Sequence, residues 1–107
     1  MNDVTGTTIA APTTSEYRHK LDYDIDAHGD KVKELVFREP TGNDIVRYGN
    51  PIRLDLYMNE ANMEAQMVAL GGVPPSTIRQ LKARDWNTIA FELMGRFFVP
   101  AMQGSKG

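Results

Sequence analysis

Large, mostly apolar residues alternate with charged ones over residues 17–26. The large residues are Tyr17, His19, Leu21, Tyr23 and Ile25. A period of two is typical of a strand with one buried face and one charged face in water. Turn-forming residues follow at 27–30, and residues 32–37 form a second short run that is rich in β-formers. The pattern therefore predicts a β-hairpin.

Helical spacing replaces the alternation after Pro40, which lacks the N–H that a strand ladder needs. Thr41 with Asp44 three residues later has the spacing of a capping box. The predicted helices begin at residues suited to helix starts, namely Thr41, Asn59, Pro74 and Asp85. Residues 71–72 are glycines that predict a left-handed helix end. An extended conformation fits residues 50–58, but the sequence alone does not decide it.

The last predicted helix, up to about residue 99, is apolar around most of its circumference. One apolar stripe consists of Trp86, Ile89, Ala90, Leu93 and Phe97. A second stripe consists of Phe91, Met94 and Phe98, and only Thr88, Glu92 and Arg96 form a polar line. A helix of this kind is buried on two sides. We expect one stripe to pack inward and the other to meet a partner, although a helix wrapped entirely by its own chain remains the alternative.

These elements predict an α+β fold with an N-terminal β-hairpin followed by three or four short helices. The length of 107 residues suits one small domain, which we place at residues 17–100. Residues 1–16 are rich in Thr, Ala and Gly without apolar periodicity, so a disordered N-terminal tail is expected there. Residues 101–107 are expected to form a flexible C-terminus.

Composition gives little support to catalysis or metal binding. Cysteine is absent, which excludes disulfides and thiolate zinc sites, and His19 and His28 are the only histidines. We interpret both as surface or turn residues. The aspartates of residues 22–26 fail as a calcium loop, because Ala27 and Lys33 occupy the positions that require Gly and Glu. The sequence therefore predicts a protein that is not an enzyme and holds no cofactor or metal.

Nucleic-acid and membrane binding are also disfavoured. The formal net charge is -2, and no apolar stretch is long enough for a membrane span. Residues 69–81 nevertheless resemble a helix-turn-helix, with Arg79, Lys82 and Arg84 placed for a DNA groove. The acidic Glu60 and Glu64 on the preceding helix oppose this reading. A small DNA-binding regulator stays as a minor alternative.

Methionines are frequent in the second half of the chain, at Met58, Met63, Met67, Met94 and Met102. Their flexible, polarizable side chains suit surfaces that accept imperfectly matched apolar partners, although they also fill cores. We predict that Phe91, Met94 and Phe98, with Met63 and Met67, form a partner-binding contact.

One segment resembles a known family. Residues 32–45 carry a strand that ends in Arg-Glu-Pro-Thr and leads into a helix, and the positions of the motif are Leu35, Arg38, Glu39, Pro40, Thr41 and Asp44. This arrangement resembles the tail assembly chaperones of Mu-like prophages and related tailed bacteriophages. The resemblance covers roughly residues 17–99, and the Arg-Glu-Pro-Thr segment is its most specific part.

The resemblance implies an assembly factor in the cytoplasm of the bacterial host. Such proteins bind the long, apolar, helical tape measure protein and keep it soluble until tail tube subunits assemble around it. The implied partners are the tape measure protein and the tail tube protein. Self-association is a separate expectation, because a helix that is apolar on most sides can pair with a second copy when no partner is present. The family offers no catalytic residues to carry over, and we interpret the motif residues as structural. A structural tail or connector component is the main alternative.

Overall fold

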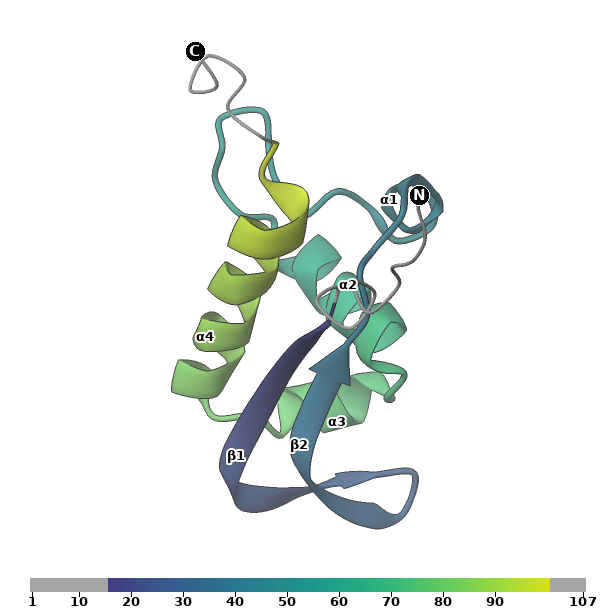
Figure 1. Ribbon diagram of the computed structural model, residues 1–107, viewed down its shortest axis with the longest axis vertical. Coiled ribbons are helices and arrows are strands. Elements are labelled where there is room, and N and C mark those ends of the chain that lie inside the picture. Colours follow the sequence, from purple (N-terminus) through teal and green to yellow (C-terminus); the bar gives the residue numbers. More distant parts are fainter. Residues whose placement is uncertain (1–15, 101–107) are drawn as a thin grey trace, which may run out of the picture.

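The computed structural model describes residues 16–100, and it shows a β-hairpin followed by helices (Figure 1). The elements in chain order are β1 (Tyr17–Ala27), β2 (Asp30–Phe37), α1 (Gly42–Tyr48), α2 (Glu60–Gly71), α3 (Pro75–Arg79), α4 (Ala83–Leu93) and the π-helical turn η2 (Met94–Phe98). The predicted α+β fold is confirmed. The predicted tail, the predicted flexible C-terminus and Met102 fall on residues outside 16–100, apart from residue 16 itself.

The hairpin pairs β1 with β2 in antiparallel register, from Tyr17 opposite Phe37 to Ala27 opposite Asp30. Its two-residue turn places His28 at φ 55° and Gly29 at φ 85°. Positive φ at both positions is the requirement of a type I′ turn, whose twist matches that of the strands it joins. The alternating burial predicted for residues 17–26 is confirmed, because every second side chain of β1 is buried or half-buried.

A bulge interrupts this register in the middle of β1. Between the pairs Lys20–Glu34 and Ile25–Val32, β1 advances five residues while β2 advances two. Extra residues on one strand bend it and increase its twist, and Figure 1 shows both strands turning sharply at this level. The bend carries Tyr23 towards the start of α4, where its hydroxyl finds partners described below.

The hydrophobic core lies between the hairpin and the helices. The largest side chains that are fully buried are Phe37, Met63, Met67, Ile78, Ile89 and Leu93. Gly71 at the end of α2 lies against Phe37, and a Cβ atom there would stand 3.0 Å from Cε1 of that ring. A side chain at position 71 would therefore require the Phe37 ring to shift by a few tenths of an ångström, and glycine allows the close approach without that shift.

The helix ends follow the sequence in most places. Asn59 caps α2 by accepting a hydrogen bond from the backbone of Asn62 at 3.0 Å, and Gly72 ends that helix in the left-handed conformation, both as predicted. The cap predicted at Asp85 is wrong. Helix α4 begins at Ala83 with Lys82 at the N-cap, because the carboxylate of Asp85 is engaged by β1 instead.

None of the helices within residues 16–100 is both long enough and apolar enough to cross a membrane.

Candidate functional site

Residues 52–58, whose conformation the sequence left open, form a protruding loop between α1 and α2. A single β-bridge joins Ile52 to Met58 at its base. The backbone N–H of Arg53 donates to the carbonyl of Tyr57 at 2.8 Å, and that of Leu56 donates to the carbonyl of Arg53 at 2.9 Å. In Figure 1 the loop rises beside the end of α4 and η2. The segment therefore has an ordered shape with its own hydrogen bonds.

This loop and α4 together expose large apolar side chains. Leu54 is fully exposed, and the exposed fractions of Leu56, Tyr57 and Phe91 are 76%, 72% and 66%. We call these four residues the apolar ridge. Leu56, Tyr57 and Phe91 line one open cleft of about 650 Å³, whose other apolar walls are Met58, Trp86 and Met94. Exposed apolar side chains gathered in this way mark interaction surfaces.

The loop holds its three residues of the apolar ridge in a fixed conformation. Leu56 adopts φ 69°, a left-handed conformation that is rare and costly for a leucine. Asp55 fixes the loop, because its carboxylate accepts hydrogen bonds from the guanidinium of Arg53 at 3.2 and 3.1 Å and from the backbone of Tyr57 at 3.1 Å. Strain maintained by surrounding bonds at an exposed apolar residue makes this loop a candidate functional surface.

The structure divides the five residues predicted to contact a partner. Phe91 is exposed on α4, and Phe98 is half-buried at the end of η2. Met63 and Met67 have 0% exposure and pack in the core, so in this conformation they offer no surface for the predicted contact. Met94 is also buried, at 8% exposure, although its side chain helps to line the cleft. The two methionines of α2 therefore fill the core.

Sequence reasoning missed Leu54, Leu56 and Tyr57. Their signal was present, because three large apolar residues stand in a segment that has no helical period and lies between two predicted helices. The alternation of this segment suggested a strand, which hid the exposure of its apolar side.

The residues of the family motif form a structural clamp at the end of the hairpin. Arg38 donates from both terminal nitrogens to the Asp44 carboxylate, at 2.8 and 3.0 Å. The same carboxylate accepts the backbone N–H of Thr41 at 2.8 Å, as the predicted capping box requires. These donors, Arg38 first, hold the pKa of the buried Asp44 carboxyl far below its usual range. The clamp ties β2 to α1.

The remaining motif residues differ in their surroundings. Leu35 lies in the core, Pro40 is half-buried, and Glu39 is exposed. The backbone N–H of Arg38 also donates to the carbonyl of Leu70 at 3.2 Å, which connects the end of β2 to α2. The motif therefore organises the junction of three elements.

A second polar network joins β1 to α4. His19, interpreted from the sequence as a surface or turn residue, is instead partly buried and donates from Nε2 to Asp85 at 2.8 Å. The hydroxyl of Tyr23 donates to the other carboxylate oxygen of Asp85 at 2.5 Å, and Nδ1 of His19 lies 2.9 Å from the hydroxyl of Tyr17. The hydrogen bonds from Tyr23 and His19 lower the pKa of Asp85. Burial, followed by the bond to Asp85, raises the pKa of Tyr23.

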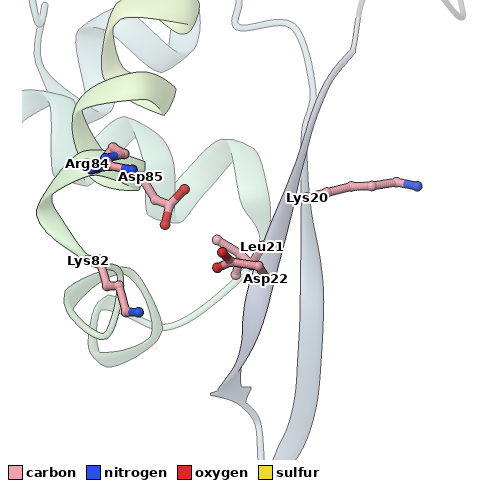
Figure 2. Close-up of a pocket in the computed structure, with 6 residues that line it drawn as sticks. All are labelled: Lys20, Leu21, Asp22, Lys82, Arg84 and Asp85. Carbon is pink, nitrogen blue, oxygen red and sulfur yellow. The ribbon is translucent and has the colours of Figure 1, made fainter.

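A polar hollow of about 570 Å³ lies beside this network at the start of α4. Figure 2 shows Asp22 and Asp85 facing the hollow, whereas Lys20 points away from it. Both ring nitrogens of His19 already have partners, so the imidazole offers no free atom for acid–base chemistry there. Charged residues of both signs line the hollow. We assign a structural role to the network.

The substitution Asp85→Asn tests that role. It removes the charge that accepts bonds from His19 and Tyr23, and we expect the free energy of unfolding to fall by about 1–3 kcal/mol. Asp22→Asn is the matched control, because Asp22 is an exposed aspartate on the same hollow. Urea unfolding measures both. Equal stabilities of the two variants would contradict the structural role of the network.

The geometry does not suit the helix-turn-helix alternative. The helix predicted to enter DNA is α3, which has five residues, and two of them, Thr77 and Ile78, are buried. Arg79 is paired with Glu64, at 2.6 Å from Nε. The hydroxyl of Thr77 donates to the carbonyl of Asp26, so α3 packs against the hairpin.

Within residues 16–100 no group of three or more histidines, aspartates or glutamates could hold a metal ion.

The comparisons with known proteins agree with the motif. Residues 18–98 match a family of phage tail assembly chaperones, described as "phage tail assembly chaperone proteins, E, or 41 or 14". The match spans most of the chain, and the chain belongs to this family. The resemblance found in the sequence is thereby confirmed. No curated protein and no solved structure matches the chain.

Proposed function

We propose that this chain binds the tape measure protein of a tailed phage through the apolar ridge and keeps it soluble during tail assembly. The exposure of Leu54, Leu56, Tyr57 and Phe91 is the observation that supports this function most strongly. Membership of the chaperone family supports the tail as the setting. Tail tube subunits would replace the chaperone when they assemble around the tape measure protein.

The shape and chemistry of the ridge fit an apolar helix. An open cleft flanked by exposed aliphatic and aromatic residues is the usual seat of an amphipathic or apolar helix. Full burial of one such side chain stabilises a complex by about 1.5–3 kcal/mol, from which ordering and association costs must be subtracted. Four such residues therefore give binding that is useful but reversible, as a protein displaced during assembly requires.

Co-expression of the tape measure protein with variants of the chain tests the proposal. The double substitution Leu56→Asp with Phe91→Asp places two charges in the cleft, and we expect at least about a tenfold loss of soluble tape measure protein. Phe98 is left unchanged because it packs partly against the core. The measurement is the amount of tape measure protein in the soluble fraction and in complex with the chain.

Val46→Asp is the matched control. Val46 is an aliphatic residue with 83% exposure on α1, which lies on the other side of the domain from the loop in Figure 1. This variant should solubilise the tape measure protein as the unsubstituted chain does. Unfolding curves establish that all variants fold. A folded double variant that still solubilises the tape measure protein would refute the proposed site.

A further inference from the structure

We propose that the segment after Pro100 docks into the cleft lined by the apolar ridge, with Met102 in the cleft, and covers it until the tape measure protein displaces the segment. The inference concerns the regulation of the site described above, and its displacement step rests on the proposed function. Met102 is one of five methionines in the second half of the chain. The core accounts for the other four, which are Met58, Met63, Met67 and Met94.

The described part of the chain ends at a wall of the cleft. The backbone N–H of Val99 donates to the carbonyl of Met94 at 2.8 Å, and Met94 lines the cleft. Figure 1 shows the end of η2 beside the loop of residues 52–58, which forms the opposite wall. Three extended residues span about 10 Å, so Met102 lies within reach of the cleft from Val99.

The apolar walls of the cleft suit a methionine. Three of the residues that line it are aromatic, namely Tyr57, Trp86 and Phe91. A thioether gains from contact with the edges of aromatic rings, and its three rotatable bonds let it fill an irregular recess. Ala101 and Gly104 on either side of the methionine are small, so the backbone of the segment can lie close to the walls.

The charges of the cleft also favour this occupant. Arg53 and Asp55 neutralise each other within the loop through two hydrogen bonds. The remaining charged residue of the cleft is Glu60, which is exposed at the start of α2. Lys106 is the one residue with a charged side chain in the segment 101–107. A basic segment and a cleft whose unbalanced charge is acidic are electrostatically complementary.

Covalent attachment makes a contact of this modest size effective. A short linker holds a tethered segment at an effective concentration of about a millimolar, so the segment can occupy a site that it would bind only weakly as a free peptide. A long apolar helix contacts the ridge along its length and therefore competes successfully with a single methionine. The segment would cover the cleft in the free chaperone and yield to the tape measure protein.

NMR of the full chain, labelled at its methionine methyl groups, tests the docking. We expect the methyl resonance of Met102, identified by its loss in Met102→Leu, to show nuclear Overhauser contacts to the rings of Tyr57 and Phe91. A mixture of labelled and unlabelled chains separates contacts within one chain from contacts between copies. A Met102 methyl group without contacts to these rings, or with contacts between copies only, would overturn the proposal.

Binding of a soluble tape measure fragment tests the displacement step. Met102→Asp should bind the fragment about two- to tenfold more tightly than the unsubstituted chain, because no docked segment competes with the fragment. Gln103→Asp is the matched control, since it adds the same charge to the segment and keeps the methionine, and it should bind like the unsubstituted chain. Unfolding curves establish that both variants fold.

The two measurements separate failure of this inference from failure of the proposed function. Equal affinities of the unsubstituted chain and Met102→Asp would overturn the competition and leave binding of the tape measure protein at the ridge standing. If none of the three proteins bound the fragment, the proposed function would be wrong, whereas the contacts of the Met102 methyl group would still decide the docking.

Discussion

Met67→Ala is expected to lower the free energy of unfolding by about 2–4 kcal/mol. Met67 has no exposed surface and belongs to the hydrophobic core, so its loss removes buried apolar contacts and leaves a cavity. The total free energy of unfolding of a native protein is about 5–15 kcal/mol, so this loss is a large part of it. Urea unfolding followed by the fluorescence of Trp86, the single tryptophan, provides the measurement.

Phe91→Ala is the counterpart on the surface. Phe91 is one of the same five residues that the sequence assigned to partner binding, but two thirds of it is exposed. Its replacement should change the free energy of unfolding by no more than about 0.5–1 kcal/mol while weakening capture of the tape measure protein. A stability loss at Phe91 that equals the loss at Met67 would show that Phe91 is a core residue, and the apolar ridge would lose its α4 member.

Asp44→Asn is expected to lower the free energy of unfolding by about 2–3 kcal/mol at neutral pH. The buried carboxylate of Asp44 accepts two bonds from Arg38 and one from the backbone of Thr41, and an amide cannot accept them all. Glu39→Gln is the control, because Glu39 is an exposed acid in the same motif. Thermal or urea unfolding of both variants measures the difference, and a Glu39 variant that loses as much stability would contradict the clamp.

The clamp should also make the free energy of unfolding depend on pH. The pKa of Asp44 is depressed in the folded chain, mainly by the hydrogen bonds from Arg38, whereas the unfolded carboxyl takes up its proton near pH 4. Protonation therefore favours the unfolded state, and the stabilisation present at neutral pH declines progressively below about pH 5. In Asp44→Asn this contribution should be missing, so the two unfolding free energies should converge at low pH. If the free energies of unfolding of the two proteins stayed equally far apart at every pH, Asp44 would not be the source of the pH dependence.

Some apolar residues of this chain fill the core and others stand on the surface, and the sequence alone could not separate the two groups. The sequence predicted that one of the two stripes of the last helix packs inward and that the other meets a partner. The structure buries Ile89, Ala90 and Leu93 of the first stripe and Met94 of the second, and it leaves Phe91 exposed. The π-helical turn η2 then interrupts the regular spacing, which changes where the residues after Leu93 project. A stripe drawn at helical spacing from Phe91 through Met94 to Phe98 therefore does not correspond to one surface.

The residues of the candidate site also divide into one that the sequence singled out and three that it did not. Phe91 could be chosen from its position on a helix that is apolar on nearly all sides. Leu54, Leu56 and Tyr57 stood out in the sequence only as large apolar residues of a segment without helical period, because their exposure depends on a loop held by Asp55 and on a left-handed Leu56 that no local propensity favours. The loop and α4 line the same cleft, although Leu56 and Tyr57 are more than 30 positions from Phe91 in the sequence. Only folding brings these residues together.

The sequence by itself determined the hairpin, the succession of helices, the Arg38–Asp44 motif and the family. Each of these depends on neighbours a few residues apart, whose spacing fixes backbone geometry and capping bonds. The tertiary structure decided that Met63 and Met67 are core, that His19 and Asp85 join β1 to α4, and that the apolar ridge is uncovered. Periodicity shows which residues share a face, but burial depends on which distant element packs against that face.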